Sequence, residues 1–177
     1  MKSNPLDLVE KYGSPLYVYN EAIFRTRCRE MKNLLSYKKF SVSFSAKANG
    51  NLRLLEIVKE EGLNVDAMSP GEIFVQLKAG FEPKQIFYIC NNVSAEEMKY
   101  AIDKGVIVSV DSLAQLELFG KINKGGEVSI RFNPGYGAGH SEKVITAGKK
   151  TKFGVDSRFI GEVKDVLNKY ELKLVGI

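Results

Sequence analysis

Lys47 is the residue of this chain whose type and surroundings best suit covalent chemistry. It follows an apolar stretch that begins at Phe40, and it precedes small and turn-forming residues and then a helical pattern. The stretch predicts a β-strand, so the lysine is expected at the carboxyl end of that strand. Partial burial there would disfavour the ammonium form and leave a nucleophilic amine. Such an amine forms a Schiff base with a carbonyl group, above all with the aldehyde of pyridoxal phosphate.

Asp66 and Arg131 are charged residues at the ends of two later apolar stretches. Asp66 suits either a cap of the following turn or a residue that orients the lysine or a cofactor. Arg131 suits either an ion-pair partner in the interior of a barrel or a donor close to the lysine or a cofactor. Both residues are candidates for cofactor binding.

His140 is the only histidine, which invites a general acid–base role. It lies, however, in a long glycine-rich segment, where a structural or loop-closing role is favoured. The glycines at 135, 137 and 139 superficially suggest a dinucleotide fingerprint. They lack the strand–turn–helix context and the spacing of the third glycine, so that interpretation is weak.

Apolar and amphipathic patterns alternate along the chain and predict the elements that position these residues. Strands are predicted at 16–19, 40–45, 63–67, 85–89, 106–110, 127–132 and 172–177. Helices are predicted at 21–35, 52–61, 71–79, 95–104, 112–120 and 157–170. Strands that alternate with helices indicate an α/β fold with a parallel sheet, either doubly wound or closed into a barrel.

The positions of the polar residues favour a (β/α)8 TIM-type barrel. They recur at the carboxyl ends of successive strands, where barrel enzymes carry their active sites. These residues are Lys47, Asp66, Ser69, Asn91, Asn92, Asp111, Ser112, Arg131 and Asn133. The longest irregular stretch, 133–156, also follows a strand end, as expected of a functional loop.

Only about six barrel strands can be counted, so the predicted barrel is incomplete. Residues 1–36 are predicted to form an N-terminal strand and helix that lead into it, and residues 37–177 to form the partial barrel domain. Two missing strands would leave two sheet edges unpaired, which favours aggregation. The chain is therefore expected to be the front part of a longer enzyme.

The composition is that of a soluble globular protein, with 177 residues, 44% of them hydrophobic and 27% charged. No apolar run approaches the length of a membrane span, and no signal peptide is visible. Two cysteines are too few for a disulfide framework, so a cytoplasmic protein is expected. The net charge is +5, but the one basic cluster lacks the interleaved aromatic residues of nucleic-acid binding; it comprises Lys143, Lys149, Lys150 and Lys152. An anionic substrate or cofactor is favoured over nucleic acid.

Five short motifs follow one another along the chain. They read SPLYVYN at 14–20, FSAKANGN at 44–51, VDAMSPGE at 65–72, VDS at 110–112 and RFNPGYGAGH at 131–140, the last followed by TAG at 146–148 and KFG at 152–154. In this order and spacing the chain resembles the fold-type III pyridoxal-phosphate enzymes, and most closely the diaminopimelate decarboxylases. The resemblance extends from Ser14 to Ile177.

The resemblance implies a carboxy-lyase that carries pyridoxal 5'-phosphate on Lys47 and converts meso-diaminopimelate to L-lysine and CO2. It also implies that Arg131 lies near the cofactor or the lysine, and that Lys152 and Phe153 pack the active-site loop. The full-length enzyme is expected to be a homodimer with a C-terminal β-domain, which is absent here, so this chain alone is expected to be inactive. Alternatives are a decarboxylase of ornithine, arginine or carboxynorspermidine, or a non-catalytic barrel that binds pyridoxal phosphate.

Overall fold

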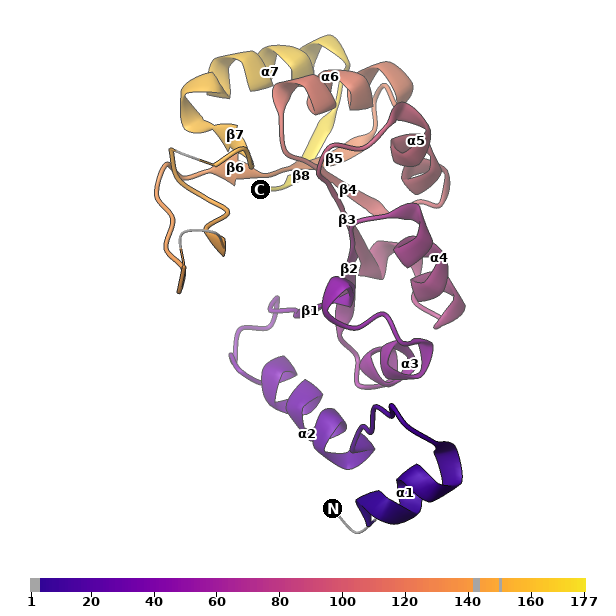
Figure 1. The fold of residues 1–177 in the computed structure, drawn as a ribbon. Coiled ribbons are helices and arrows are strands. Elements are labelled where there is room, and N and C mark those ends of the chain that lie inside the picture. The colour runs from indigo at the N-terminus through magenta and orange to yellow at the C-terminus, as the bar shows by residue number, and fades with distance from the viewer. Residues whose placement is uncertain (1–3, 142–143, 150) are drawn as a thin grey trace.

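Helices and parallel strands alternate along the chain in the computed structural model, which describes residues 4–141, 144–149 and 151–177 (Figure 1). The helices are α1 Pro5–Tyr12, α2 Glu21–Lys32, α3 Leu52–Glu60, α4 Pro70–Lys78, α5 Ala95–Asp103, α6 Leu113–Ile122 and α7 Ile160–Lys169. The main strands are β1 Ser43–Ser45, β2 Asn64–Ala67, β3 Ile86–Cys90, β4 Ile107–Val110, β5 Glu127–Ile130 and β8 Lys173–Gly176. The described elements also include the short 3-10 turns η1 Ala46–Ala48, η2 Pro83–Gln85 and η4 Ser157–Phe159, and the two-residue strands β6 Phe132–Asn133 and β7 Val155–Asp156.

The six main strands form one parallel sheet in the order β1-β2-β3-β4-β5-β8. Within the described residues, β1 pairs only with β2, and β8 pairs only with β5, so the sheet stays open at both ends. It curves, with helices α3 to α7 along its outer side (Figure 1). This arrangement confirms the prediction of an incomplete α/β barrel with about six strands.

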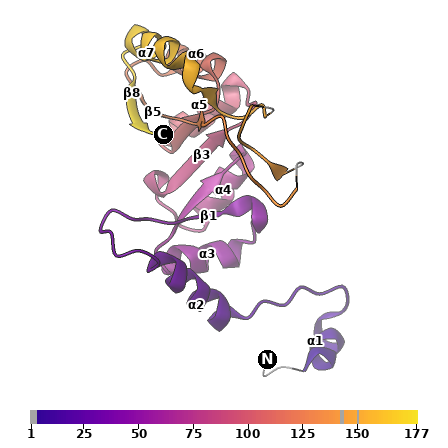
Figure 2. The ribbon, with the colours of Figure 1, turned by 90° about the vertical axis from the view of Figure 1, so that its left-hand side faces the viewer.

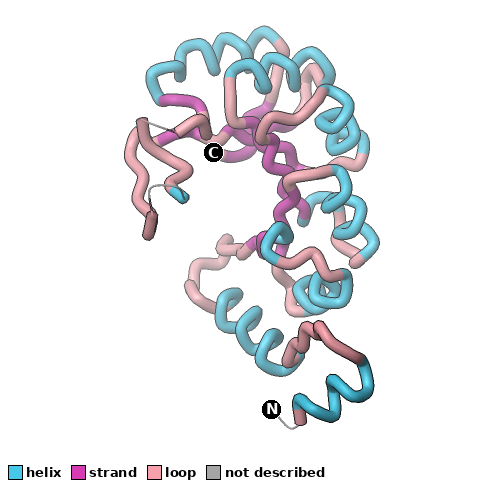
Figure 3. The backbone as a smooth tube through the Cα atoms, in the orientation of Figure 1, coloured by secondary structure: helices cyan, strands magenta, loops and turns pink. Residues whose placement is uncertain are grey.

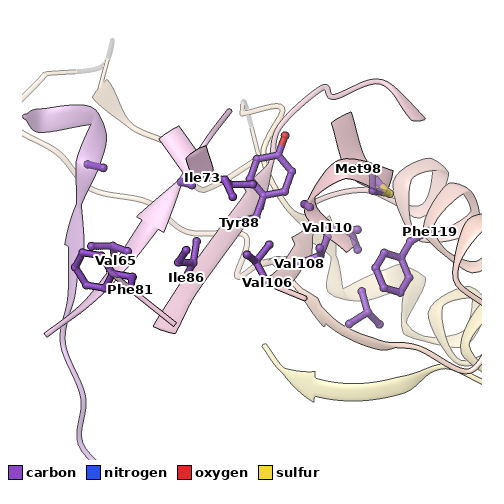
Figure 4. Packing of buried hydrophobic residues seen from close by; sticks show 14 of the residues in the cluster. Val65, Ile73, Phe81, Ile86, Tyr88, Met98, Val106, Val108, Val110 and Phe119 are labelled. Carbon is purple, nitrogen blue, oxygen red and sulfur yellow. The ribbon is translucent and has the colours of Figure 1, made fainter. Parts of the chain in front are cut away.

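The hydrophobic core lies between the sheet and these outer helices. Val65, Ile86, Tyr88, Val108 and Val110 alternate along β2, β3 and β4 and are fully or almost fully buried (Figure 4). A side chain of this size that leaves water contributes about 1.5–3 kcal/mol. Because one face of each strand packs on the helices, the intervening residues face the other side of the sheet. Asp66 is one of these intervening residues.

Serine caps start three of the helices that follow the strands. In each case the serine Oγ accepts a hydrogen bond of 3.2 Å from the N–H three residues later, in the pairs Ser69–Glu72, Ser94–Glu97 and Ser112–Gln115. Such caps satisfy N–H groups that a helix leaves free at its start. The turns at the carboxyl edge of the sheet are therefore well defined by local sequence.

The predicted N-terminal strand at 16–19 is wrong. These residues form no strand, and the Tyr17 side chain is 85% exposed. Their β-branched and aromatic residues favour a strand, but in the described part of the chain no neighbouring strand lies alongside to complete a ladder. Helix α1 precedes them, has no buried residue and stands apart from the sheet in both ribbon views (Figures 1 and 2).

The predicted strand at 127–132 divides into two elements. The Arg131 N–H donates to the Val110 carbonyl at 2.8 Å, whereas the Arg131 carbonyl accepts from the Val155 N–H, also at 2.8 Å. The chain thus changes partner at Arg131, and β6 Phe132–Asn133 pairs with β7 Val155–Asp156. The described residues between β6 and β7, which are 134–141, 144–149 and 151–154, are largely irregular, as predicted (Figure 3).

An ion-pair network attaches α2 to the end of α3. Arg25 Nη1 lies 2.9 Å from Glu61 Oε1, and Arg29 Nε lies 2.6 Å from Glu61 Oε2. Arg25 Nη2 also contacts Glu60 Oε2 at 2.5 Å. Hydrogen bonds from Arg29 and then Arg25 lower the pKa of Glu61 from its ordinary value of 4.5 to about 2. The docking of α2 therefore depends on an ionised Glu61.

We expect the stability that Glu61 provides to be lost on acidification. Because its pKa is lower in the folded state, the contribution is complete above pH 4.5 and disappears as the pH falls towards 2. Glu61→Gln should weaken this part of the pH dependence, as measured by urea unfolding between pH 3 and pH 7. Glu162→Gln, an exposed change on α7, serves as the control. Equal pH profiles for both variants would contradict a role for the network.

None of the helices in the described ranges is long and apolar enough to cross a lipid bilayer.

Candidate functional site

Lys47 lies in the short turn η1, immediately after β1. Its side chain is exposed, and no residue in the described ranges forms a hydrogen bond or ion pair with its amine. A lysine in this position can react with a carbonyl group without first breaking a contact. The structure thus places Lys47 at the carboxyl end of a barrel strand, as predicted, but the expected partial burial of its side chain is wrong, because no described residue covers the end of β1 there.

Asp66 lies on the neighbouring strand β2, directly opposite Ser45 in the register. Its Oδ1 accepts hydrogen bonds from the Ser45 hydroxyl at 3.1 Å and from the Ala46 N–H at 3.3 Å. Burial raises the pKa of Asp66, while these two bonds and the nearby Lys47 ammonium act against that rise. The carboxylate therefore holds the turn that carries Lys47, and Ser69 rather than Asp66 caps α4.

Arg131 lies at the same edge of the sheet but not beside Lys47, because β2, β3 and β4 separate their strands. The guanidinium donates from Nη2 to the Thr146 carbonyl at 3.1 Å and stacks on the Phe153 ring, with 4.8 Å from Cζ to the ring centroid. Lys152 also places its amine 5.5 Å from the centre of that ring. Phe153 thus packs against Arg131, in agreement with the predicted packing of the loop.

The sequence identified Asp111 only as a strand-end residue, but in the structure it is buried and lines a hollow. It directly follows β4, is 9% exposed, and lines a hollow of about 510 Å³ with Asn91, Lys152 and Phe153. Burial raises the pKa of Asp111, and the positive charges of Arg131 and then Lys152 oppose this rise. The buried Asn91 Oδ1 has no hydrogen-bond partner within the described residues. An aspartate directly after a buried strand was the signal that could have identified Asp111.

Two buried glutamines also escaped sequence reasoning. Gln76 on α4 is 0% exposed, and its Nε2 donates to the Asp66 carbonyl at 2.6 Å. Gln115 on α6 accepts through Oε1 from the Asp111 N–H at 3.1 Å. Each therefore holds the backbone of an aspartate at a strand end. A polar residue at a core position of each helix is the only signal that the sequence offers.

The remaining candidates, His140 and the basic cluster, lie in or next to the glycine-rich segment that follows Arg131. His140 is exposed, and its role in loop closure stays a prediction. Of the basic cluster, Lys149 and Lys152 are exposed, whereas Lys143 and Lys150 lie outside the described residues. The structure thus brings Lys47 and Asp66 together and places Arg131 with Asp111 and Phe153.

A family model described as "Pyridoxal-dependent decarboxylase, pyridoxal binding domain" matches residues 21–177. The chain belongs to this family. The match includes every candidate site residue, and the exposed Lys47 beside Asp66 suits the attachment of an aldehyde.

Relatives of this chain include diaminopimelate decarboxylases. That of Methanothermobacter thermautotrophicus is 42% identical over 99% of this chain and 42% of its own length. That of Escherichia coli K12 is 31% identical over 98% of this chain and 41% of its own length. The chain thus spans about two fifths of the length of these curated relatives. The crystal structure of the Helicobacter pylori enzyme complexed with L-lysine aligns with a TM-score of 0.90 at 28% identity, and covers 97% of this chain and 45% of that one.

Proposed function

We propose that this chain forms the pyridoxal-phosphate-binding part of a diaminopimelate decarboxylase, which converts meso-diaminopimelate to L-lysine and CO2. The main support for the proposal is the 42% identity to such an enzyme over almost the whole of this chain. The accessible amine of Lys47 at the carboxyl end of β1 supports it independently, since barrel enzymes carry their reactive groups at this edge.

Lys47 is the proposed attachment point for the cofactor aldehyde. When bound, pyridoxal phosphate supplies an electron sink for the charge that develops as the carboxylate leaves. The Lys47 amine then moves a proton to or from the substrate carbon. Asp66 holds the lysine's turn through Ser45 and Ala46, and its negative charge lies close to the amine.

Arg131 is the second proposed cofactor-binding residue. Its guanidinium is held by the Thr146 carbonyl and the Phe153 ring, so it offers a fixed positive charge to an anionic or oxygen-bearing ligand. We also propose that the full-length protein is a homodimer in the cytoplasm. In this chain, residues 1–36 would lead into the barrel, and residues 37–177 would form the barrel domain.

The first test is to mix the chain with pyridoxal phosphate, reduce the product with borohydride and map the labelled lysines by mass spectrometry. We expect the label at Lys47, and we expect Lys47→Arg to lose it, whereas Lys164→Arg, an exposed change on α7, retains it. A label spread over surface lysines would contradict the site. Substrate choice is tested by CO2 release from meso-diaminopimelate, ornithine and arginine in a chain of the relatives' full length.

A further inference from the structure

Asn133 is the residue at which the two ends of the glycine-rich loop meet. Its Oδ1 accepts hydrogen bonds from the N–H groups of Gly135 and Gly148, both at 2.9 Å. Its Nδ2 donates to the Gly148 carbonyl at 3.1 Å, to Thr151 Oγ1 at 3.3 Å and to the Phe153 carbonyl at 3.1 Å. One amide thus uses both its acceptor and its donor capacity.

These contacts join parts of the chain that are far apart in sequence. In the described residues, the only strand pairing that joins the start of the loop to its end is that of β6 with β7, and it comprises two residue pairs. A ladder of this length is marginal by itself. The Asn133 side chain therefore supplies much of the connection between residues 133–135 and the three residues Gly148, Thr151 and Phe153.

The same segment holds Arg131. The two groups that contact the guanidinium are the Thr146 carbonyl and the Phe153 ring, and both lie close in sequence to atoms that Asn133 binds. Asp111 directly follows the adjacent strand β4; burial raises its pKa, and the positive charge of Arg131 opposes that rise. If Asn133 releases Gly148 and Phe153, the guanidinium loses its two described direct contacts.

We propose that Asn133 is a positioning residue that holds Gly148, Thr151 and Phe153 and thereby places the Arg131 guanidinium at the carboxyl edge of the sheet. Its importance for cofactor binding rests on the proposed function, in which Arg131 contacts the cofactor. The placement of Arg131 itself can be tested without any cofactor.

The cofactor-free test measures how fast phenylglyoxal modifies individual arginines, by peptide mass spectrometry. Asn133→Ala is expected to raise the rate at Arg131 about tenfold, because several hydrogen bonds of ordinary strength are lost. The rate at Arg158, whose side chain is already 81% exposed, should not change. Asn168→Ala, an exposed change on α7, is the matched control. An unchanged rate at Arg131 would overturn the proposal.

Two further variants separate loop positioning from loss of folding. Asn133→Asp keeps the acceptor for Gly135 and Gly148 but places a carboxylate against the carbonyl oxygens of Gly148 and Phe153, so it should free Arg131 at least as much as alanine does. Thr151→Val removes one partner of Asn133 and should give a smaller increase, about threefold. Thermal unfolding of each variant identifies any general loss of structure, which would accelerate modification at Arg25 as well.

With pyridoxal phosphate, Asn133→Ala is expected to weaken apparent binding about tenfold while the borohydride label stays on Lys47. A more reactive Arg131 with unchanged cofactor affinity would overturn the functional half of the inference. If the unaltered chain takes up no cofactor at Lys47, the proposed function fails, whereas the Arg131 modification rates still decide whether Asn133 positions the guanidinium.

Discussion

Lys47→Ala is expected to lower the rate of CO2 release from meso-diaminopimelate by about 10²–10⁴-fold, the usual effect of removing a group that transfers protons in the transition state. The substitution also removes the proposed attachment point of the cofactor. Asp66, whose side chain holds the turn through Ser45 and Ala46, is a carboxylate and does not replace the amine. The measurement requires a chain of the relatives' full length, loaded with pyridoxal phosphate.

Lys47→Arg tests whether Lys47 acts through its nucleophilic amine or only through its positive charge. It keeps a cation at the end of β1, but a guanidinium stays protonated and does not form the Schiff base. The two variants should therefore lose activity to a similar extent, while their thermal unfolding stays close to that of the unaltered protein because Lys47 is exposed. Full activity in either variant would place the reactive amine elsewhere.

Gly154→Ala is expected to detach the loop from the sheet edge. Gly154 has a φ of +80°, and an added Cβ would lie 2.8 Å from the Asn133 nitrogen and 2.9 Å from the Phe132 carbonyl carbon. The positive φ alone costs about 1–3 kcal/mol, and the backbone atoms cannot move aside without breaking the β6–β7 pairing. Hydrogen exchange at residues 145–155 should rise strongly, and unfolding should need less urea.

Gly161→Ala is expected to have the opposite effect and to stabilise the protein, because Gly161 has space for a side chain. It lies in α7, and an added Cβ would meet no atom within 4 Å. Because alanine favours helix more than glycine does, this variant should be more stable by about 0.5–1 kcal/mol. If Gly154→Ala behaved like Gly161→Ala, the close approach of Gly154 to Asn133 would be wrong.

The sequence by itself determined the strand–helix alternation and the position of Lys47. Each strand core is an apolar run, and each following helix has its own period and often its own serine cap, so these signals are local. The order of strands then follows from the preference for adjacent, right-handed crossovers. Asp66 was recognised for the same reason, because a strand end next to that of β1 lies beside it in a parallel sheet.

The tertiary structure alone decided which residues act together. Residues 16–19 have the composition of a strand, but strand formation depends on a neighbour that local sequence does not specify. Arg131 could be placed at a strand end, whereas its change of partner from Val110 to Val155 depends on a segment 24 residues further along, by the numbering of the chain. The Gln76 side chain bonds to a residue 10 positions away and the Asn133 side chain to one 20 positions away, and no periodicity in the sequence reports such contacts. Local pattern predicts the elements, but long-range hydrogen bonds and packing determine how the site is held.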